Sequence, residues 1–130
     1  MKIEIPGRPV AWARAGCSRG RFFDRQAKEK QSFQWRLKTG FRGSPINRPI
    51  ALTCTFSFQV PKSWSKVKRA AMLGKPHESR PDLDNLAKFV NDVANGILWQ
   101  DDAQIARLSL EKVWAEEDKT VIDFEILRAS

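Results

Sequence analysis

The sequence has few of the residues on which several classes of protein depend. It contains two cysteines, Cys17 and Cys54, and one histidine, His77. Disulfide frameworks and zinc sites use clustered pairs of cysteines, so we expect both thiols to be reduced. No apolar run approaches the roughly 18 to 20 residues that cross a bilayer, and no apolar stretch follows a basic lead at the N-terminus. We therefore expect no membrane association, no secretory signal and a cytoplasmic location.

Acidic residues are also scarce in the first 80 positions of the chain. Residues 1–80 hold 18 Lys and Arg but only 4 Asp and Glu, a net +14, whereas residues 81–130 hold 5 and 11, a net −6. The sum is the formal charge of +8 for 130 residues, 42% of which are hydrophobic. A chain of this size and apolarity folds as one domain around its own core. Its basic excess is typical either of a protein that binds nucleic acid or of a solubilising surface.

Hydrophobic periodicity predicts an α+β domain over residues 1–130, with a mixed β-sheet packed against two principal helices. We expect strands at 2–5, 50–60, 105–114 and 120–127, and helices at 24–38 and 83–98. Residues 10–14 and 21–23 flank a hairpin or loop at 16–20, and a short helix follows Ser63. In the strand at 50–60 alternation is strict and turns Cys54 toward the core, where a thiol is more often packing than chemistry.

The start of the second helix carries two carboxylates, Asp82 and Asp84, after Pro81. On a regular helix, side chains two residues apart point in different directions. At a helix entry they can converge, because Pro81 favours an extended residue before it and Asp82 then lies ahead of the first turn. The alternative is that one of the two aspartates simply caps the helix, whose positive N-terminus attracts an anion.

Lys88 follows Asp84 by four residues and precedes Asp92 by four, on a flank of the helix that differs from the apolar stripe. One interpretation is a surface ion pair with Asp84, which stabilises a helix by a few tenths of a kcal/mol. The other is that Lys88 reaches a phosphate held at the acidic site. The sequence leaves both open.

Asp101 and Asp102 lie beyond the helix, so that residues 82–102 contain five aspartates. Carboxylates about 4 Å apart repel by roughly 4 kcal/mol at an effective dielectric near 20, so a cation must offset their charge if they meet. Oxygen ligands without Cys or His suit Mg²⁺ or Mn²⁺ rather than zinc, and we do not expect His77 to bind metal. A basic surface with an acidic metal site predicts phosphodiester hydrolysis of a nucleic acid.

The same residues resemble a known family. Asp82-Leu83-Asp84-Asn85-Leu86-Ala87-Lys88 and Trp99-Gln100-Asp101-Asp102-Ala103-Gln104-Ile105 look like the two signature elements of the RusA-type Holliday-junction resolvases, often encoded by phages and prophages. The match is specific over about residues 77–114 and weaker elsewhere. The N-terminal residues match no family motif.

This resemblance implies a mechanism and partners. Asp82, Asp84 and Asp102 would be the metal-binding catalytic carboxylates, Asp101 would assist, and Lys88 would be the essential lysine. The family implies a homodimer that depends on Mg²⁺ and resolves four-way DNA junctions by paired nicks, in DNA recombination and repair.

Six basic residues of the segment 62–80 are the candidates for holding DNA: Lys62, Lys66, Lys68, Arg69, Lys75 and Arg80. The aromatic residues placed among basic ones are candidates for stacking on bases or for wedging the junction open: Trp12, Phe22, Phe23 and Trp64. Two alternatives remain at this point. One is a binding protein without catalytic activity, and the other is a nuclease that acts on other branched or duplex DNA.

Overall fold

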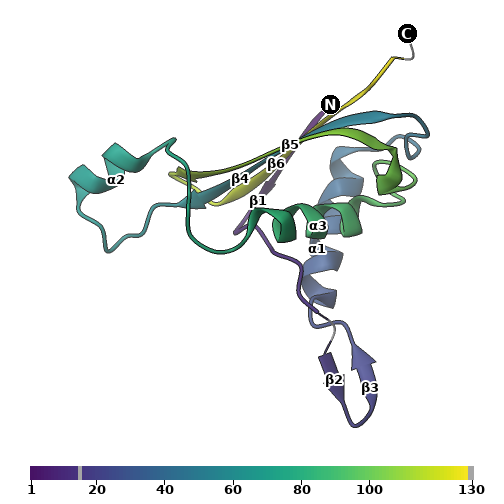
Figure 1. The fold of residues 1–130 in the computed structure, drawn as a ribbon, viewed down its shortest axis with the longest axis horizontal. Coiled ribbons are helices and arrows are strands. Elements are labelled where there is room, and N and C mark those ends of the chain that lie inside the picture. Colours follow the sequence, from purple (N-terminus) through teal and green to yellow (C-terminus); the bar gives the residue numbers. More distant parts are fainter. Residues whose placement is uncertain (15, 129–130) are drawn as a thin grey trace.

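The computed structural model describes residues 1–14 and 16–128, apart from the side chains of Cys17, Ser18, Phe22 and Phe23. The fold is a four-stranded mixed sheet with helices on one face, which confirms the predicted α+β class (Figure 1). In chain order the elements are β1 (Lys2–Pro6), β2 (Gly16–Ser18), β3 (Arg21–Phe23), α1 (Ala27–Gly40), β4 (Ile50–Gln59), α2 (Lys66–Met72), α3 (Leu83–Ala94), the 3-10 helix η1 (Asp102–Gln104), β5 (Ile105–Ala115) and β6 (Lys119–Ile126).

The sheet has the strand order β1-β6-β4-β5. β6 pairs antiparallel with both β1 and β4, and β4 pairs parallel with β5. A parallel pair needs a crossover, which here is the long connection from β4 through α2 and α3 to β5. The crossover therefore carries both signature elements of the sequence and fixes where they lie relative to β5.

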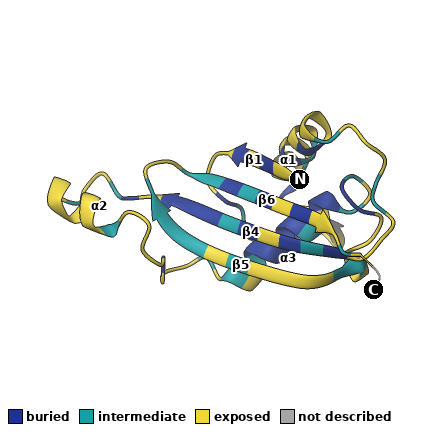
Figure 2. Ribbon diagram, turned by 90° about the horizontal axis from the view of Figure 1, so that it is seen from above, coloured by how far each residue is buried: buried dark blue, intermediate teal, exposed yellow. Residues whose placement is uncertain are grey.

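The core lies between the sheet and the helices α1 and α3. The alternation predicted for β4 is confirmed, because Leu52, Cys54, Phe56 and Phe58 are all buried and share one core cluster with residues of α3. Figure 2 shows buried residues along β4, with α3 behind the sheet. From α3 the core receives the stripe of buried residues that the sequence predicted: Leu86, Ala87, Phe89, Val90, Val93 and Ala94. Phe33 and Leu37 are the buried residues of α1.

Two element boundaries, the start of α1 and the end of α3, differ from the predictions. Asp24 does not cap α1: it accepts a hydrogen bond from the Gln26 amide and pairs with Lys30, and the helix begins at Ala27. α3 ends at Ala94 rather than at residue 98, because Asn95 leaves the helical conformation and Gly96 takes a positive φ of 81°. Leu98 is nevertheless buried, and it reaches the core from the turn after α3 rather than from the helix.

Two parts of the molecule project from this body (Figure 1). The β2–β3 hairpin extends beyond the helices. Its first strand is Gly16–Ser18, and the preceding residues 10–14 form no strand. The loop helix predicted after Ser63 is α2, capped by the Ser65 side chain, which accepts from the Lys68 amide. Among the residues described, no helix is long and apolar enough to span a membrane.

Candidate active site

Asp82 and Asp84 lie at the N-terminus of α3, as predicted. Asp82 is the N-cap residue with extended φ and ψ of −69° and 141°, yet its side chain makes no capping hydrogen bond. Asp84 lies in the first turn and its Oδ1 accepts from the Asn85 amide at 3.0 Å. Both aspartates are exposed. Helix capping therefore does not account for the Asp82 carboxylate, which remains available to a ligand.

The chain entering α3 is held by β5. The Lys112 ammonium donates to the carbonyl of Ser79 at 2.6 Å and to that of Pro81 at 2.7 Å. Because Pro81 immediately precedes Asp82, these bonds fix the direction in which the backbone approaches the helix. Lys112 is thus a positioning residue for which the sequence predicted no role.

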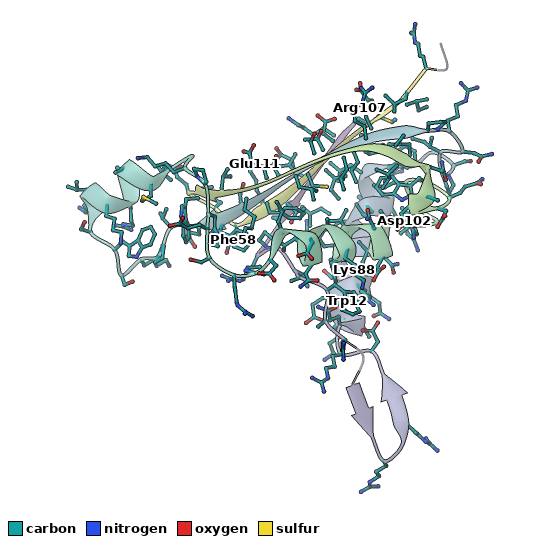
Figure 3. The ribbon with its side chains drawn as sticks, in the orientation of Figure 1. Trp12, Phe58, Lys88, Asp102, Arg107 and Glu111 are labelled. Carbon is teal, nitrogen blue, oxygen red and sulfur yellow. The ribbon has the colours of Figure 1, made fainter. Side chains whose placement is uncertain are left out.

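Lys88 lies one helical turn beyond Asp84 and is exposed. Within the described part of the chain it forms no ion pair with Asp84 or Asp92, so the surface ion pair considered above is not formed. Its Nζ instead lies over the ring of Trp12, 3.5 Å from the ring centroid. Trp12 and Lys88 lie side by side below the sheet (Figure 3).

The two aspartates after α3 have different surroundings. Asp101 caps η1: its carboxylate accepts from the Ala103 amide, and the Gln104 side chain accepts in return from the Asp101 amide. Gln104 also donates to the Ile46 and Arg48 carbonyls, which ties η1 to the loop before β4. Asp102 is exposed and, among the described residues, its carboxylate has no such partner. Within the described residues, Asp102 is the member of this pair whose carboxylate makes no hydrogen bond.

Asp102 does not lie beside Asp82 and Asp84 in one chain. α3 begins just after Asp82 and runs for 12 residues, about 18 Å at 1.5 Å per residue, before the turn that leads to Asp102. Along β5, Lys112 at the Pro81 end is seven positions from Ile105, which follows η1, or about 23 Å of strand. Asp102 accordingly lies past the far end of α3 (Figure 3). In the part of the chain that is described, no three His, Cys, Asp or Glu side chains could jointly hold a metal ion.

The basic residues predicted to hold DNA lie on the arm formed by residues 62–80, which includes α2. All are exposed except Arg69, which is half-buried. Lys68 lies over the Trp64 ring at 4.2 Å, and Trp64 packs edge-on against Trp114 of β5 at 5.0 Å. Trp64 therefore joins the arm to the sheet, and the basic side chains of the arm other than Arg69 face solvent. Phe22 and Phe23 fall among the side chains that are not described.

His77 anchors the other end of this arm in an apolar cage. Its ring lies between those of Phe58 and Trp114, 4.5 Å and 4.2 Å away, and is buried. Burial lowers the pKa of His77, and Lys112 lowers it further. In β4, burial raises the pKa of the Cys54 thiol to about 12, so this cysteine is a core residue rather than a nucleophile.

Exposed carboxylates with a free ammonium group one turn away, beside a basic arm, are groups suited to hydrolysing a nucleic-acid phosphodiester. The arrangement of these groups on an α+β fold is the one expected of a nuclease. The profile of the endodeoxyribonuclease RusA family matches residues 6–125. The chain belongs to this family, and its class is therefore that of a DNA-cleaving hydrolase. It is also similar to the uncharacterized protein YqaN of Bacillus subtilis (strain 168), with 30% identity over 133 residues that cover 94% of this chain and 93% of YqaN.

Proposed function

We propose that this protein is a divalent-metal-dependent Holliday-junction resolvase. The observation that carries the proposal is the pair of exposed carboxylates at the mouth of α3, where the Asp82 side chain makes no capping hydrogen bond. Lys88 follows one turn later on the same helix and would neutralise the charge that develops on the scissile phosphate. Family membership supports the same chemistry.

Mg²⁺ is the proposed cofactor, and Mn²⁺ its substitute. The donor set fits: Asp82, Asp84 and Asp102 offer hard carboxylate oxygens, and the one histidine of the chain is held in the apolar cage at β5. Such an ion, when bound, polarises the phosphoryl oxygen and lowers the pKa of the attacking water. Asp101 has a lesser role in this proposal, because its carboxylate is engaged in capping η1.

The separation of Asp102 from Asp82 and Asp84 supports a homodimer. One chain offers two carboxylates at one end of α3 and the third past its other end. A two-fold axis would bring Asp102 of the partner subunit to the pair at Asp82 and Asp84, and would complete two equivalent sites at once. Each site would then draw on both subunits.

The free edge of β5 is a suitable surface for this dimer. β5 is an edge strand of the sheet, and among the described residues the segment around Pro76 bridges only its C-terminal part, at Val113. Antiparallel pairing of residues 105–111 with their copy would centre on Leu108, which is 47% exposed. Arg107 would then lie diagonally opposite Glu111 of the partner subunit. Asp102 of the partner subunit, just before β5, would approach the end at which Lys112 holds Pro81.

Two sites related by a two-fold axis suit a four-way junction, which has near two-fold symmetry and is resolved by paired nicks. We propose that the protein acts in DNA recombination and repair in the cytoplasm, as an enzyme of phage or prophage type. The basic arm, residues 62–80, would hold the DNA backbone in this function. Its six cations would contact phosphates without reading sequence.

The test is cleavage of a synthetic four-way junction by the wild-type protein with Mg²⁺ or Mn²⁺. We expect paired nicks, and we expect Asp82→Asn and Asp102→Asn to abolish them while junction binding survives or tightens, since each change removes a negative charge near phosphate. Absence of cutting by the wild type with both ions, or full cutting by Asp82→Asn, would contradict the proposal. Equal cutting of plain duplex would instead identify a nuclease of the same family with another substrate.

A further inference from the structure

The segment between β1 and β2 passes alongside α3 and touches it through its main chain. The amide of Trp12 donates to the carbonyl of Asn85 at 2.9 Å. Asn85 follows Asp84 directly, so this bond ties Trp12 to the first turn of the helix that carries the candidate site. Residues more than 70 positions apart in the sequence are therefore joined at this point.

A buried glutamine fixes the main chain on both sides of Trp12. The Oε1 of Gln26 accepts from the Ala13 amide at 3.0 Å, and its Nε2 donates to the Ala11 carbonyl at 2.7 Å. Gln26 is only 9% exposed, and a buried amide that uses both its donor and its acceptor on one extended segment holds that segment in register. The main chain from which the Trp12 indole projects is thus held by three hydrogen bonds that do not involve the indole.

The indole so placed meets the ammonium of Lys88, 3.5 Å from its ring centroid. A cation over an aromatic face is attracted by the ring quadrupole, most strongly for tryptophan. A lysine on a solvent-exposed helix face otherwise samples many rotamers. The two carboxylates at helical spacing, Asp84 and Asp92, are the competing partners, and Lys88 pairs with neither within the described residues.

We propose that Trp12 is a positioning residue of the active site: its indole face holds the Lys88 ammonium away from Asp84, where it meets the scissile phosphate. This inference rests on the proposed role of Lys88 in phosphodiester hydrolysis. Holding the cation before the substrate arrives lowers the cost of ordering it in the transition state. Trp12 acts through Lys88, so its effect falls on the rate of cleavage rather than on binding of the junction.

The first test replaces the side chain and leaves the backbone bonds to Asn85 and Gln26 in place. Single-turnover nicking of a four-way junction is measured at saturating protein, together with the junction Kd. We expect Trp12→Leu to slow nicking roughly 3- to 30-fold with Kd changed less than about twofold, and Trp12→Phe to retain much of the rate. Trp35→Leu, on an exposed tryptophan of α1, is the matched control and should cut like the wild type.

The second test separates a cation–π contact from simple packing, which is the competing explanation because Trp12 also borders the core. Tryptophans with one, two and four ring fluorines, introduced at position 12 alone, keep the shape of the side chain and progressively weaken its attraction for a cation. We expect the logarithm of the nicking rate to fall with each added fluorine at position 12 and to stay constant in the same series at position 35. In a Lys88→Met background, already slow, Trp12→Leu should add no further loss.

The outcomes distinguish this inference from the proposed function. A flat fluorination series in a wild-type background that cuts junctions overturns the role of Trp12 and leaves the nuclease standing. Additive losses from Trp12→Leu and Lys88→Met do the same. If the wild type cuts no junction with either ion, both proposals fail together. The fluorinated series tests the cation–π contact even if Trp12→Leu does not fold.

Discussion

Lys112 on β5 donates a hydrogen bond of 2.7 Å to the carbonyl of Pro81, the residue before Asp82. A second bond from the same ammonium reaches Ser79. β5, which follows the signature element at 99–105, thus holds the residues that lead into the other signature element at 82–88. This relationship links the stability of the fold to the position of the Asp82 carboxylate.

Removing the Lys112 ammonium should therefore affect both properties. Lys112→Met leaves two carbonyls without their donor, and hydrogen bonds from charged groups contribute about 1.5 to 3 kcal/mol. We expect the free energy of unfolding in urea to fall by about 1 to 2 kcal/mol and the nicking rate to fall at least tenfold at a temperature where the variant is folded. Lys112→Arg should recover stability more than rate. Unchanged nicking by folded Lys112→Met would show that Asp82 does not depend on this bond.

The two neighbouring aspartates, Asp101 and Asp102, should respond differently to the same substitution. Asparagine is a good capping residue, so Asp101→Asn keeps the cap of η1 and should reduce nicking less than tenfold. Asp102→Asn should abolish nicking without lowering stability, because its carboxylate has no hydrogen bond in the described structure. Asp101→Ala, which loses the cap, should lower the free energy of unfolding by about 1 kcal/mol. Equal loss of nicking in both asparagine variants would assign both carboxylates to the site.

Mixing two inactive variants tests whether each site is shared between subunits. In a heterodimer of Asp82→Asn and Asp102→Asn chains, one site would have all three carboxylates. The other site would keep Asp84 alone. We expect the mixture, after subunit exchange, to nick one strand of a junction, whereas neither variant nicks alone. Arg107→Glu should weaken dimerisation in sedimentation, and Arg107→Glu with Glu111→Arg should restore it. Sites formed within one chain would give a mixture as inactive as its components.

The basic arm should determine the salt dependence of DNA binding. The logarithm of the affinity falls linearly with the logarithm of the salt concentration, with a slope of about 0.9 per neutralised phosphate. Lys66→Glu combined with Lys68→Glu should weaken junction binding and reduce this slope by about 2. A control with the same change in net charge, Lys2→Glu with Arg128→Glu, should leave the slope nearly unchanged. Equal effects of both pairs would assign the arm to general surface charge.

Stability should decrease as the pH falls through the ordinary pKa of histidine. Burial lowers the pKa of His77 below 6.5, so the unfolded chain takes up a proton that the folded protein resists. The stability of the native state is thus fully present above about pH 6.5 and is lost progressively below it. His77 is the only histidine of the chain, and urea denaturation between pH 7.5 and about 5 covers its ordinary pKa. His77→Gln should flatten this dependence, and an equal slope in that variant would contradict the assignment.

Local pattern was enough to predict most of the fold. β4 follows from strict alternation and α3 from its apolar stripe, because burial on one face imposes these periods whatever surrounds the element. The ends of α1 and α3 could not be predicted in this way. Asp24 and Leu98 both satisfy the local rule for their helix, but Asp24 pairs with Lys30 and Leu98 is buried from a turn.

The sequence by itself predicted the class of chemistry, because the spacing of Asp82, Asp84 and Lys88 places them near one helix entry and carboxylates without cysteine or clustered histidine suit a hard cation. Only the tertiary structure decided which groups are free and which meet. It engages Asp101 in a cap and leaves Asp102 open, separates Asp102 from Asp82 by the length of α3, and brings Trp12 against Lys88. Those relations depend on how the sheet arranges segments that are distant in the sequence, so the spacing of neighbouring residues cannot predict them.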